Sequence, residues 1–253
     1  MTEMDKLERD GFLLVPGALD STTVNAWREM LYRRHATGVH DIANSVGNYA
    51  YDQLLEEEPE LARPLIGHGS VAPFLKEALG RQCQLRSFRA HLNRADYLQE
   101  WHLDFYQYWH QKREGRHAAE TVCMNTTFYL TDNTPETGRL RFLPEFFKSP
   151  VPEDVFKHFR YTDDRDNPFQ KWCDAQEHVD LYPMAGDAVV FFSHIPHQGA
   201  KLGDDPDGLI RCNIVLHYQA NPMFPGVGFV SRSVHTLETL GFEGSFPFAA
   251  PQA

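Results

Sequence analysis

The chain has 253 residues, of which 42% are hydrophobic and 23% charged, and its formal net charge is −11. A chain of this length can bury a substantial core, as one large domain or as two small ones. Its acidic balance argues against nucleic acid and anionic lipid as partners, because phosphate binding needs clustered Lys and Arg. Small molecules remain open as ligands, with neutral or amine-bearing compounds slightly favoured.

Cysteine usage and the amino-terminal segment bear on location. The four cysteines are irregularly spaced and form no C-x-x-C pair, unlike a zinc ribbon or a small disulfide scaffold. They indicate reduced, buried thiols in a reducing compartment. The charged start lacks the apolar stretch of a signal peptide, and no run of about 18 apolar residues is present. We therefore expect a cytoplasmic protein without a membrane span, as a monomer or homodimer.

Helical signals dominate the first part of the chain. A short strand at 11–20 precedes a helix for which Ser21 is the expected N-cap, with Val24, Trp27 and Leu31 on one face. Two further helices are predicted over residues 55–67 and 71–80.

Strand signals dominate from residue 81 onward. Runs rich in β-branched and aromatic residues are separated by Gly/Pro turns and predict strands over 82–94, 121–132, 138–146, 188–193 and 211–220. The polar stretch at 145–178 predicts a long loop with a short helix. This pattern predicts a mainly β fold with a helical N-terminal layer, as a barrel or jelly roll. We expect one domain, with helical support over 1–80, a jelly-roll core over 81–220 and a C-terminal extension over 221–253.

His102 and Asp104 are the first candidates for a metal site, because side chains two apart on a strand share a face. An imidazole and a carboxylate can then bind one metal ion together. A second histidine would complete a 2-His-1-carboxylate set, which leaves open positions and is typical of non-haem Fe(II). A lone His-x-Asp is common by chance, so the signal depends on that second histidine.

The segment 186–203 supplies two histidines, His194 and His197, after a Gly-Asp turn and a buried strand. Either one can complete the site or can be an ordinary loop histidine. Fourteen residues beyond His197, Arg211 opens the next predicted strand. Arginine grips a carboxylate through two parallel hydrogen bonds, as the far carboxylate of 2-oxoglutarate would require in a β-barrel.

In these motifs the chain resembles the phytanoyl-CoA hydroxylase-like (PhyH-type) family of Fe(II)/2-oxoglutarate-dependent oxygenases. The matching marks are His-Leu-Asp at 102–104, the segments 134–150 and 186–197, and Arg211. In the family, the distal histidine lies eleven residues after the glycine of the Gly-Asp turn, and counting from Gly186 selects His197. The family fold is a double-stranded β-helix, a cupin-like jelly roll.

The resemblance implies that Fe(II) is bound by His102, Asp104 and His197, and that 2-oxoglutarate and O₂ are co-substrates. Arg211 would hold the far carboxylate of 2-oxoglutarate, with Arg89 as the alternative anchor. The implied reaction oxidises an unactivated C–H bond of a small metabolite in natural-product biosynthesis, by hydroxylation, cyclisation, desaturation or epimerisation. Related halogenases carry Gly or Ala in place of the carboxylate, so the presence of Asp104 argues against halogenation.

Weaker candidates for binding 2-oxoglutarate lie on the predicted strands. Asn93 shares a strand face with Arg89 and His91, and all three side chains can line one cavity. Thr126 and Asn125 lie mid-strand and can hydrogen-bond a carboxylate, or can face solvent instead. Candidates for the substrate wall flank His-x-Asp, with core packing as their alternative role: Trp101, Phe105 and Tyr106.

Two other classes of function remain open. A cupin-type metal enzyme that does not use 2-oxoglutarate would keep the metal ligands but have no use for Arg211. A non-catalytic β-sandwich binding module would hold no metal. Metal analysis and iron-dependent release of succinate from 2-oxoglutarate separate the three classes.

Overall fold

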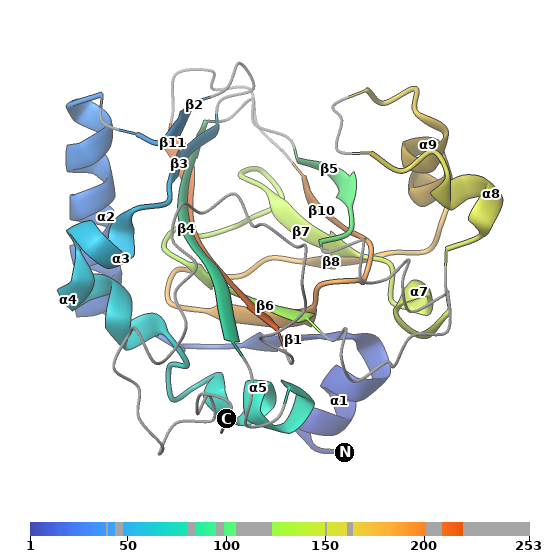
Figure 1. Cartoon of the computed structure of the whole chain (residues 1–253), viewed down its shortest axis with the longest axis horizontal. Helices are drawn as coiled ribbons and strands as arrows, with labels where there is room; N and C mark the ends of the chain where they lie inside the picture. The colour runs from blue at the N-terminus through green and yellow to red at the C-terminus, as the bar shows by residue number, and fades with distance from the viewer. Residues whose placement is uncertain are drawn as a thin grey trace, which may run out of the picture.

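Two antiparallel sheets pack against each other, and helices cover the outer face of the larger one (Figure 1). The computed structural model describes residues 1–38, 40–43, 48–79, 84–94, 99–104, 123–149, 151–160, 164–200 and 209–219. The prediction of a mainly β fold is confirmed. Within the described ranges, we find no helix that combines the length and the apolar character needed to cross a bilayer.

The larger sheet has seven strands in the order β1-β9-β6-β11-β4-β3-β2. Their bounds are β1 Phe12–Val15, β2 Ile42–Ala43, β3 Asn48–Tyr51, β4 Gln84–Arg94, β6 Cys123–Tyr129, β9 Ala188–Phe192 and β11 Leu209–Gln219. The smaller sheet has four strands in the order β5-β10-β7-β8. Their bounds are β5 Gln99–His102, β7 Arg139–Phe142, β8 Val179–Leu181 and β10 His197–Ala200.

The pairing of the strands from β4 to β11 is nested. β4 pairs with β11, β5 with β10, β6 with β9, and β7 with β8, all antiparallel. The first half of this series therefore folds back along the second half. Because most successive strands change sheet, the doubled chain wraps around a common interior.

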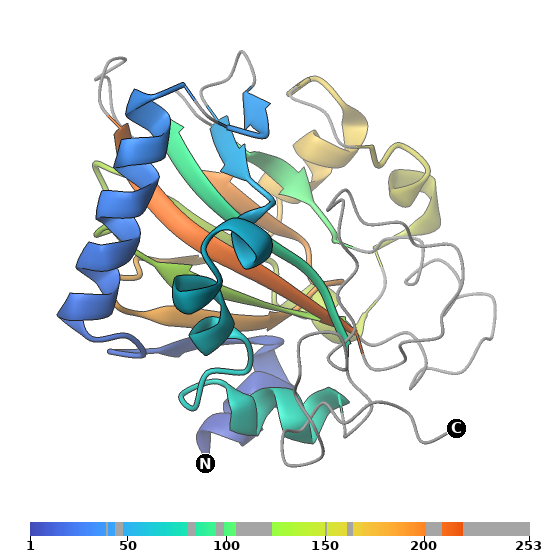
Figure 2. The same ribbon diagram turned by 60° about the vertical axis from the view of Figure 1, so that its left-hand side comes forward.

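The helix α2 (Ser21–Ala36) lies along the outer face of the larger sheet (Figure 2). Its N-cap is Asp20, not the predicted Ser21: the Asp20 carboxylate accepts a hydrogen bond of 2.7 Å from the backbone N–H of Thr23. Asp20 has extended backbone angles, whereas Ser21 is already helical, so the carboxylate satisfies a free N–H of the first turn. The predicted apolar face of Val24, Trp27 and Leu31 is buried as expected.

The remaining N-terminal helices are short. They are α1 Glu3–Asp10, α3 Leu54–Glu57, α4 Pro59–Ala62, the 3-10 turn η1 Arg63–Leu65 and α5 Ala72–Leu79. The single helix predicted over 55–67 is thus divided into three pieces. Pro59 begins α4 and Pro64 is the second residue of η1, and each interrupts the helix because proline lacks the N–H that a continuing helix requires.

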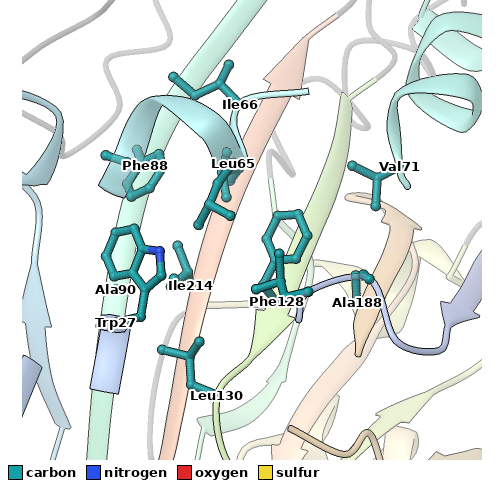
Figure 3. Packing of buried hydrophobic residues seen from close by; sticks show 14 of the residues in the cluster. Trp27, Leu65, Ile66, Val71, Phe88, Ala90, Phe128, Leu130, Ala188 and Ile214 are labelled. Atoms are coloured by element: carbon teal, nitrogen blue, oxygen red, sulfur yellow. The ribbon is translucent and has the colours of Figure 1, made fainter. Parts of the chain in front are cut away.

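The main core lies between these helices and the larger sheet. Figure 3 shows Trp27 of α2 beside Phe88 and Ala90 of β4, with Ile214 of β11 behind them. On β11 the even-numbered residues, from Cys212 to Tyr218, belong to this core. Since strand side chains alternate between faces, the odd-numbered residues of β11 point into the interior between the sheets.

The interior between the sheets is apolar in one part and polar in another. A second cluster of buried residues fills the apolar part: Tyr129, Leu140, Phe142, Val189, Phe191 and Ile195. In register with the odd residues of β11, β4 presents Ser87, Arg89, His91 and Asn93 to the same interior. The fold therefore places a polar wall opposite the smaller sheet.

The stretch between β7 and β8 holds three short helices where one was predicted: α7 Glu145–Lys148, α8 Glu153–Phe156 and α9 Pro168–Asp174. They build a third apolar cluster that includes Trp101, Phe169 and Cys173. This cluster packs α8 and α9 against β5, at the edge of the smaller sheet (Figure 1).

Candidate metal centre

Two histidines face each other across the ladder between β5 and β10. His102 is the last residue of β5, His197 is the first of β10, and the two are direct partners in the strand register. Opposite residues of an antiparallel pair project to the same face. Their ring centroids are 4.0 Å apart, and both side chains are buried. The nested pairing thus joins residues that lie far apart in the chain.

Asp104 lies where the chain crosses from one sheet to the other. It is two residues beyond the end of β5, and its backbone N–H donates to the carbonyl of Ser193, just past β9, at 2.9 Å. Its Oδ2 is 3.5 Å from Nε2 of His197 and its Oδ1 is 3.9 Å from Nε2 of His102. The three potential ligand atoms all lie within 4.8 Å of one another.

Both imidazoles present the nitrogen that a metal needs. Nδ1 of His102 lies 2.8 Å from the carbonyl of Glu100, and Nδ1 of His197 lies 2.9 Å from that of Ile195. A carbonyl can only accept, so each Nδ1 carries a proton and each Nε2 is the atom left to bind a metal; Nε2 of His102 also lies 2.9 Å from Nε2 of Gln99. Such a backbone partner fixes the tautomer and orientation of a metal-binding histidine. The residues therefore fit a 2-His-1-carboxylate metal site.

The Asp104 carboxylate is itself held by a chain of polar side chains. Nδ2 of Asn125 donates to Oδ2 of Asp104 at 2.5 Å, and Oγ of Ser193 donates to Oδ1 of Asn125 at 2.5 Å. From the other side, Nε2 of His217 lies 3.3 Å from Oδ2, and Nδ1 of His217 lies 2.5 Å from Oγ of Ser87. Asn125 thus supports a ligand and does not face solvent.

Burial and charge set the protonation state of the site. Burial and, to a lesser extent, the neighbouring His197 lower the pKa of His102 to about 4. Burial alone would raise the pKa of Asp104, but hydrogen bonds from His197 and His217 hold it well below its usual value. At neutral pH the site therefore offers a neutral His102 and an ionised carboxylate, the forms that bind a divalent metal.

Arg211 lies on the inner face of β11 and is 8% exposed. Its guanidinium carbon is 5.9 Å from the centre of the Tyr129 ring, and its buried Nε has no hydrogen-bond partner among the described residues. The head group rests on Gly199, where an added Cβ would come within 3.1 Å of Nη1. A buried guanidinium with an unpaired Nε, lying against a residue that has no side chain, is suited to bind a carboxylate ligand.

The alternative anchor, Arg89, is already engaged. Its Nε and Nη2 donate to the two carboxylate oxygens of Asp52, at 2.5 and 2.8 Å. Asn93 lies opposite Arg211 in the register, and its Nδ2 donates to Oδ1 of Asn48 at 2.8 Å. The geometry therefore favours Arg211 over Arg89 as the residue that binds a carboxylate. Asn93 lies beside Arg211 on the same inner face.

Several predicted site residues lie elsewhere. Thr126 is opposite Leu216 in the register, so its side chain faces the helices and neither solvent nor the metal ligands. Trp101 packs into the cluster beneath α8 and α9, on the face of β5 away from His102. His194 lies 3.1 Å from the carbonyl of Phe147 and stacks on its ring. Phe105 and Tyr106 lie outside the described residues.

Sequence reasoning missed His217, Ser193 and Gly199. His217 had a usable signal, since it lies six residues beyond Arg211 and the period of two places both on one strand face. Ser193 and Gly199 carried no comparable signal, because their roles depend on which strands become neighbours.

Comparison with known proteins gives a family and several structural neighbours. The model of the phytanoyl-CoA dioxygenase (PhyH) family matches residues 7–203. No curated protein matches the sequence. Among solved structures, the epimerase SnoN in complex with Fe³⁺, alpha ketoglutarate and nogalamycin RO is 16% identical, with a TM-score of 0.65 over 94% of this chain and 95% of that chain.

Two further solved structures have the same fold. HygX from Streptomyces hygroscopicus, with nickel, 2-oxoglutarate and hygromycin B bound, is 15% identical, with a TM-score of 0.65 over 92% of this chain and 98% of that chain. The alpha ketoglutarate dependent carbocyclase SnoK from nogalamycin biosynthesis is 18% identical, with a TM-score of 0.63 over 86% of this chain and 82% of that chain.

Proposed function

Since the chain belongs to the phytanoyl-CoA dioxygenase (PhyH) family, we propose that it is an Fe(II)- and 2-oxoglutarate-dependent oxygenase of small organic metabolites. The family resemblance inferred from the sequence is confirmed. The observation that carries the proposal is the convergence of His102, Asp104 and His197, each of which places one ligand atom within 4.8 Å of the other two. Two histidines and one carboxylate leave open positions for a co-substrate and dioxygen.

In this proposal, His102, Asp104 and His197 would hold Fe(II), which together with 2-oxoglutarate would activate dioxygen, the oxidant for C–H oxidation. Arg211 binds the far carboxylate of 2-oxoglutarate against Gly199. Gly199 is two residues beyond His197 on β10, which is about 7 Å along a strand. A five-carbon keto-diacid spans that length, so its chelating end can reach the metal ligands while its other end meets the guanidinium.

The substrate would lie against the polar wall of β4 and β11. Nδ1 of His91 is 3.0 Å from Oδ1 of Asn48, an acceptor, so His91 carries its proton on Nδ1 and its Nε2 can accept. Burial and the charge of Arg89 hold the pKa of His91 well below its usual value, so the ring stays neutral. A substrate with O–H or N–H groups fits this wall, which supports a neutral or amine-bearing metabolite.

The type of substrate follows from the neighbours. The structures of SnoN and HygX hold nogalamycin RO and hygromycin B, and SnoK belongs to nogalamycin biosynthesis. We therefore place this chain in natural-product tailoring, by hydroxylation, cyclisation, desaturation or epimerisation. A cytoplasmic location belongs to the same proposal, supported by the buried thiols of Cys173 and Cys212.

The architecture in this proposal is a double-stranded β-helix. Its support is the nested pairing of β4–β7 with β8–β11, which is how a long antiparallel hairpin rolls up into a jelly roll. The helices before residue 80 share their core with the larger sheet, which supports a single domain.

Anaerobic reconstitution tests the function. Purified protein is mixed with Fe(II) and then 2-oxoglutarate, and visible absorbance and iron-dependent succinate release are measured with and without oxygen. We expect a new absorption band and succinate formation, both absent in His197→Ala and retained in the matched control His194→Ala. Metal binding without either signal would favour a cupin-type enzyme that does not use 2-oxoglutarate, and absence of metal binding would reject the proposal.

A further inference from the structure

Among the residues that the structure describes, the outer edge of β5 in the smaller sheet is covered by a side chain and not by a strand. β5 is the terminal strand of that sheet and pairs with β10 on one side. The outer side of an edge strand presents free backbone N–H and C=O groups. At Trp101 both groups are taken by one residue of α9: Oε1 of Gln170 accepts from the Trp101 N–H at 2.9 Å, and Nε2 of Gln170 donates to the Trp101 carbonyl at 2.8 Å.

Gln170 is rigidly placed to do this. It is 1% exposed and lies in the first turn of α9, whose N-cap Asn167 accepts from the N–H of Phe169 at 2.8 Å. Nδ2 of Asn167 also donates to the carbonyl of His158, just after α8, at 3.0 Å. The amide of Gln170 therefore acts as a fixed one-residue substitute for a neighbouring strand.

Other contacts join the same segment to the residues before His102. Nε1 of Trp101 donates to Oδ1 of Asp174 at 2.8 Å. The buried carboxylate of Glu100 accepts from Nε of Arg165 at 3.0 Å and from Nε2 of Gln198 at 3.3 Å. The carbonyl of Glu100 in turn receives Nδ1 of His102, so fixing Glu100 fixes the orientation of the imidazole.

We propose that α9 clamps the outer edge of β5 and that Gln170 is a positioning residue for the ligand His102. This inference rests on the proposed metal site. Gln170 does not touch the ligand; it acts through the backbone of Trp101 and Glu100 on the imidazole that follows. Loss of the clamp lets β5 shift against β10, which weakens metal binding before it unfolds the protein.

The test uses the full-length protein and Co(II), whose visible bands report coordination geometry. Gln170→Leu keeps the approximate volume and removes both hydrogen bonds, whereas Gln170→Glu keeps an acceptor for the Trp101 N–H. The matched control is Gln176→Leu, since Gln176 lies just beyond α9 and donates to the carbonyl of Trp172 and not to β5. Measurements are the Co(II) dissociation constant, the Co(II) spectrum and amide hydrogen exchange over residues 99–104.

We expect Gln170→Leu to weaken Co(II) binding about 10- to 100-fold, as loss of an orienting partner does, and to speed exchange over 99–104. Gln170→Glu should lie between Gln170→Leu and the native protein, and Gln176→Leu should match the native protein. Native-like affinity, spectrum and exchange in Gln170→Leu would overturn the inference. If Gln170→Leu does not fold, native-like behaviour of Gln170→Glu would overturn it. Failure of the native protein to bind Co(II) would instead reject the proposed metal site.

Discussion

Gly199 of β10 lies directly beneath the guanidinium of Arg211 on β11. A Cβ at position 199 would stand 3.1 Å from Nη1 and 3.6 Å from Nη2 of Arg211, closer to Nη1 than ordinary van der Waals contact. The glycine is needed here for space and not for backbone conformation. The buried Nε of Arg211 has no partner among the described residues. The guanidinium can occupy this position only because Gly199 has no side chain.

A side chain at position 199 should therefore weaken 2-oxoglutarate binding selectively. We expect Gly199→Val to raise the KM for 2-oxoglutarate by about 10-fold or more, since a charge-assisted hydrogen bond contributes about 1.5–3 kcal/mol. Gly199→Ala should have a smaller effect, because Arg211 can yield by a few tenths of an ångström. Metal affinity, measured separately by titration, should change little in both. An unchanged KM in Gly199→Val would place the far carboxylate elsewhere.

Removal of the carboxylate ligand should abolish turnover. In Asp104→Gly we expect 2-oxoglutarate consumption to fall by more than about 100-fold, because loss of a mere orienting partner already costs 10- to 100-fold. The variant also leaves Asn125 and His217 facing an empty position. Succinate formation at saturating Fe(II) measures the effect, and undiminished turnover would exclude Asp104 as an essential ligand.

The support of Asp104 by Asn125 can be tested against a residue next to it. Asn125→Leu removes the donor to Asp104 and leaves Oγ of Ser193 without its acceptor, so we expect metal affinity to fall about 10- to 100-fold. Thr126→Val is the matched control, because its side chain faces the helices on the opposite side of β6. Equal losses in both variants would mean that the effect is general destabilisation of the strand.

His91 should make the metal-free protein sensitive to acid. Burial first, and then the charge of Arg89, hold its folded-state pKa well below the usual value of 6.5. The unfolded chain takes up this proton near pH 6.5 and the folded chain does not. The contribution of neutral His91 to the free energy of unfolding is therefore fully present above about pH 6.5 and is lost as the pH falls. The total loss is about 1.4 kcal/mol for each unit by which folding lowers the pKa of His91.

Urea unfolding in the presence of a chelator measures this dependence. We expect the free energy of unfolding of the native sequence to decrease from about pH 7 to about pH 5, and His91→Gln to show a smaller decrease. Parallel curves for the two proteins would assign the acid sensitivity to other groups.

The metal ligands could be predicted from the sequence because each one lies in a short contiguous motif at a strand end. His102 and Asp104 share one motif, and the turn at Gly186 fixes the distance to His197. Arg211 was expected to open a strand and is the third residue of β11. Local periodicity indicates His102, Asp104 and Arg211, the helical layer and most long strands, whereas the choice of His197 over His194 depends on the family resemblance.

The supporting residues could not be predicted, for physical reasons. All seven residues of β6 are buried, so no alternation of polarity tells which face of the strand is interior, and the sequence does not distinguish Asn125 from Thr126 as the inward-facing residue. Gln170 and Asp174 lie in a polar stretch typical of a solvated loop. Their contacts with Trp101 exist because α9 docks on β5, which no local pattern encodes.

The nested pairing of strands has a consequence for how the protein acquires its activity. His102 and His197 meet in the ladder between β5 and β10, which closes a loop of more than ninety residues. Contacts of such high contact order form slowly, because the entropy of closing the loop is lost before the contacts compensate for it. During refolding from denaturant, the ability to bind a metal ion should therefore arise late, after β7 and β8 have paired. The rate of metal uptake can then be used to measure when the fold is complete.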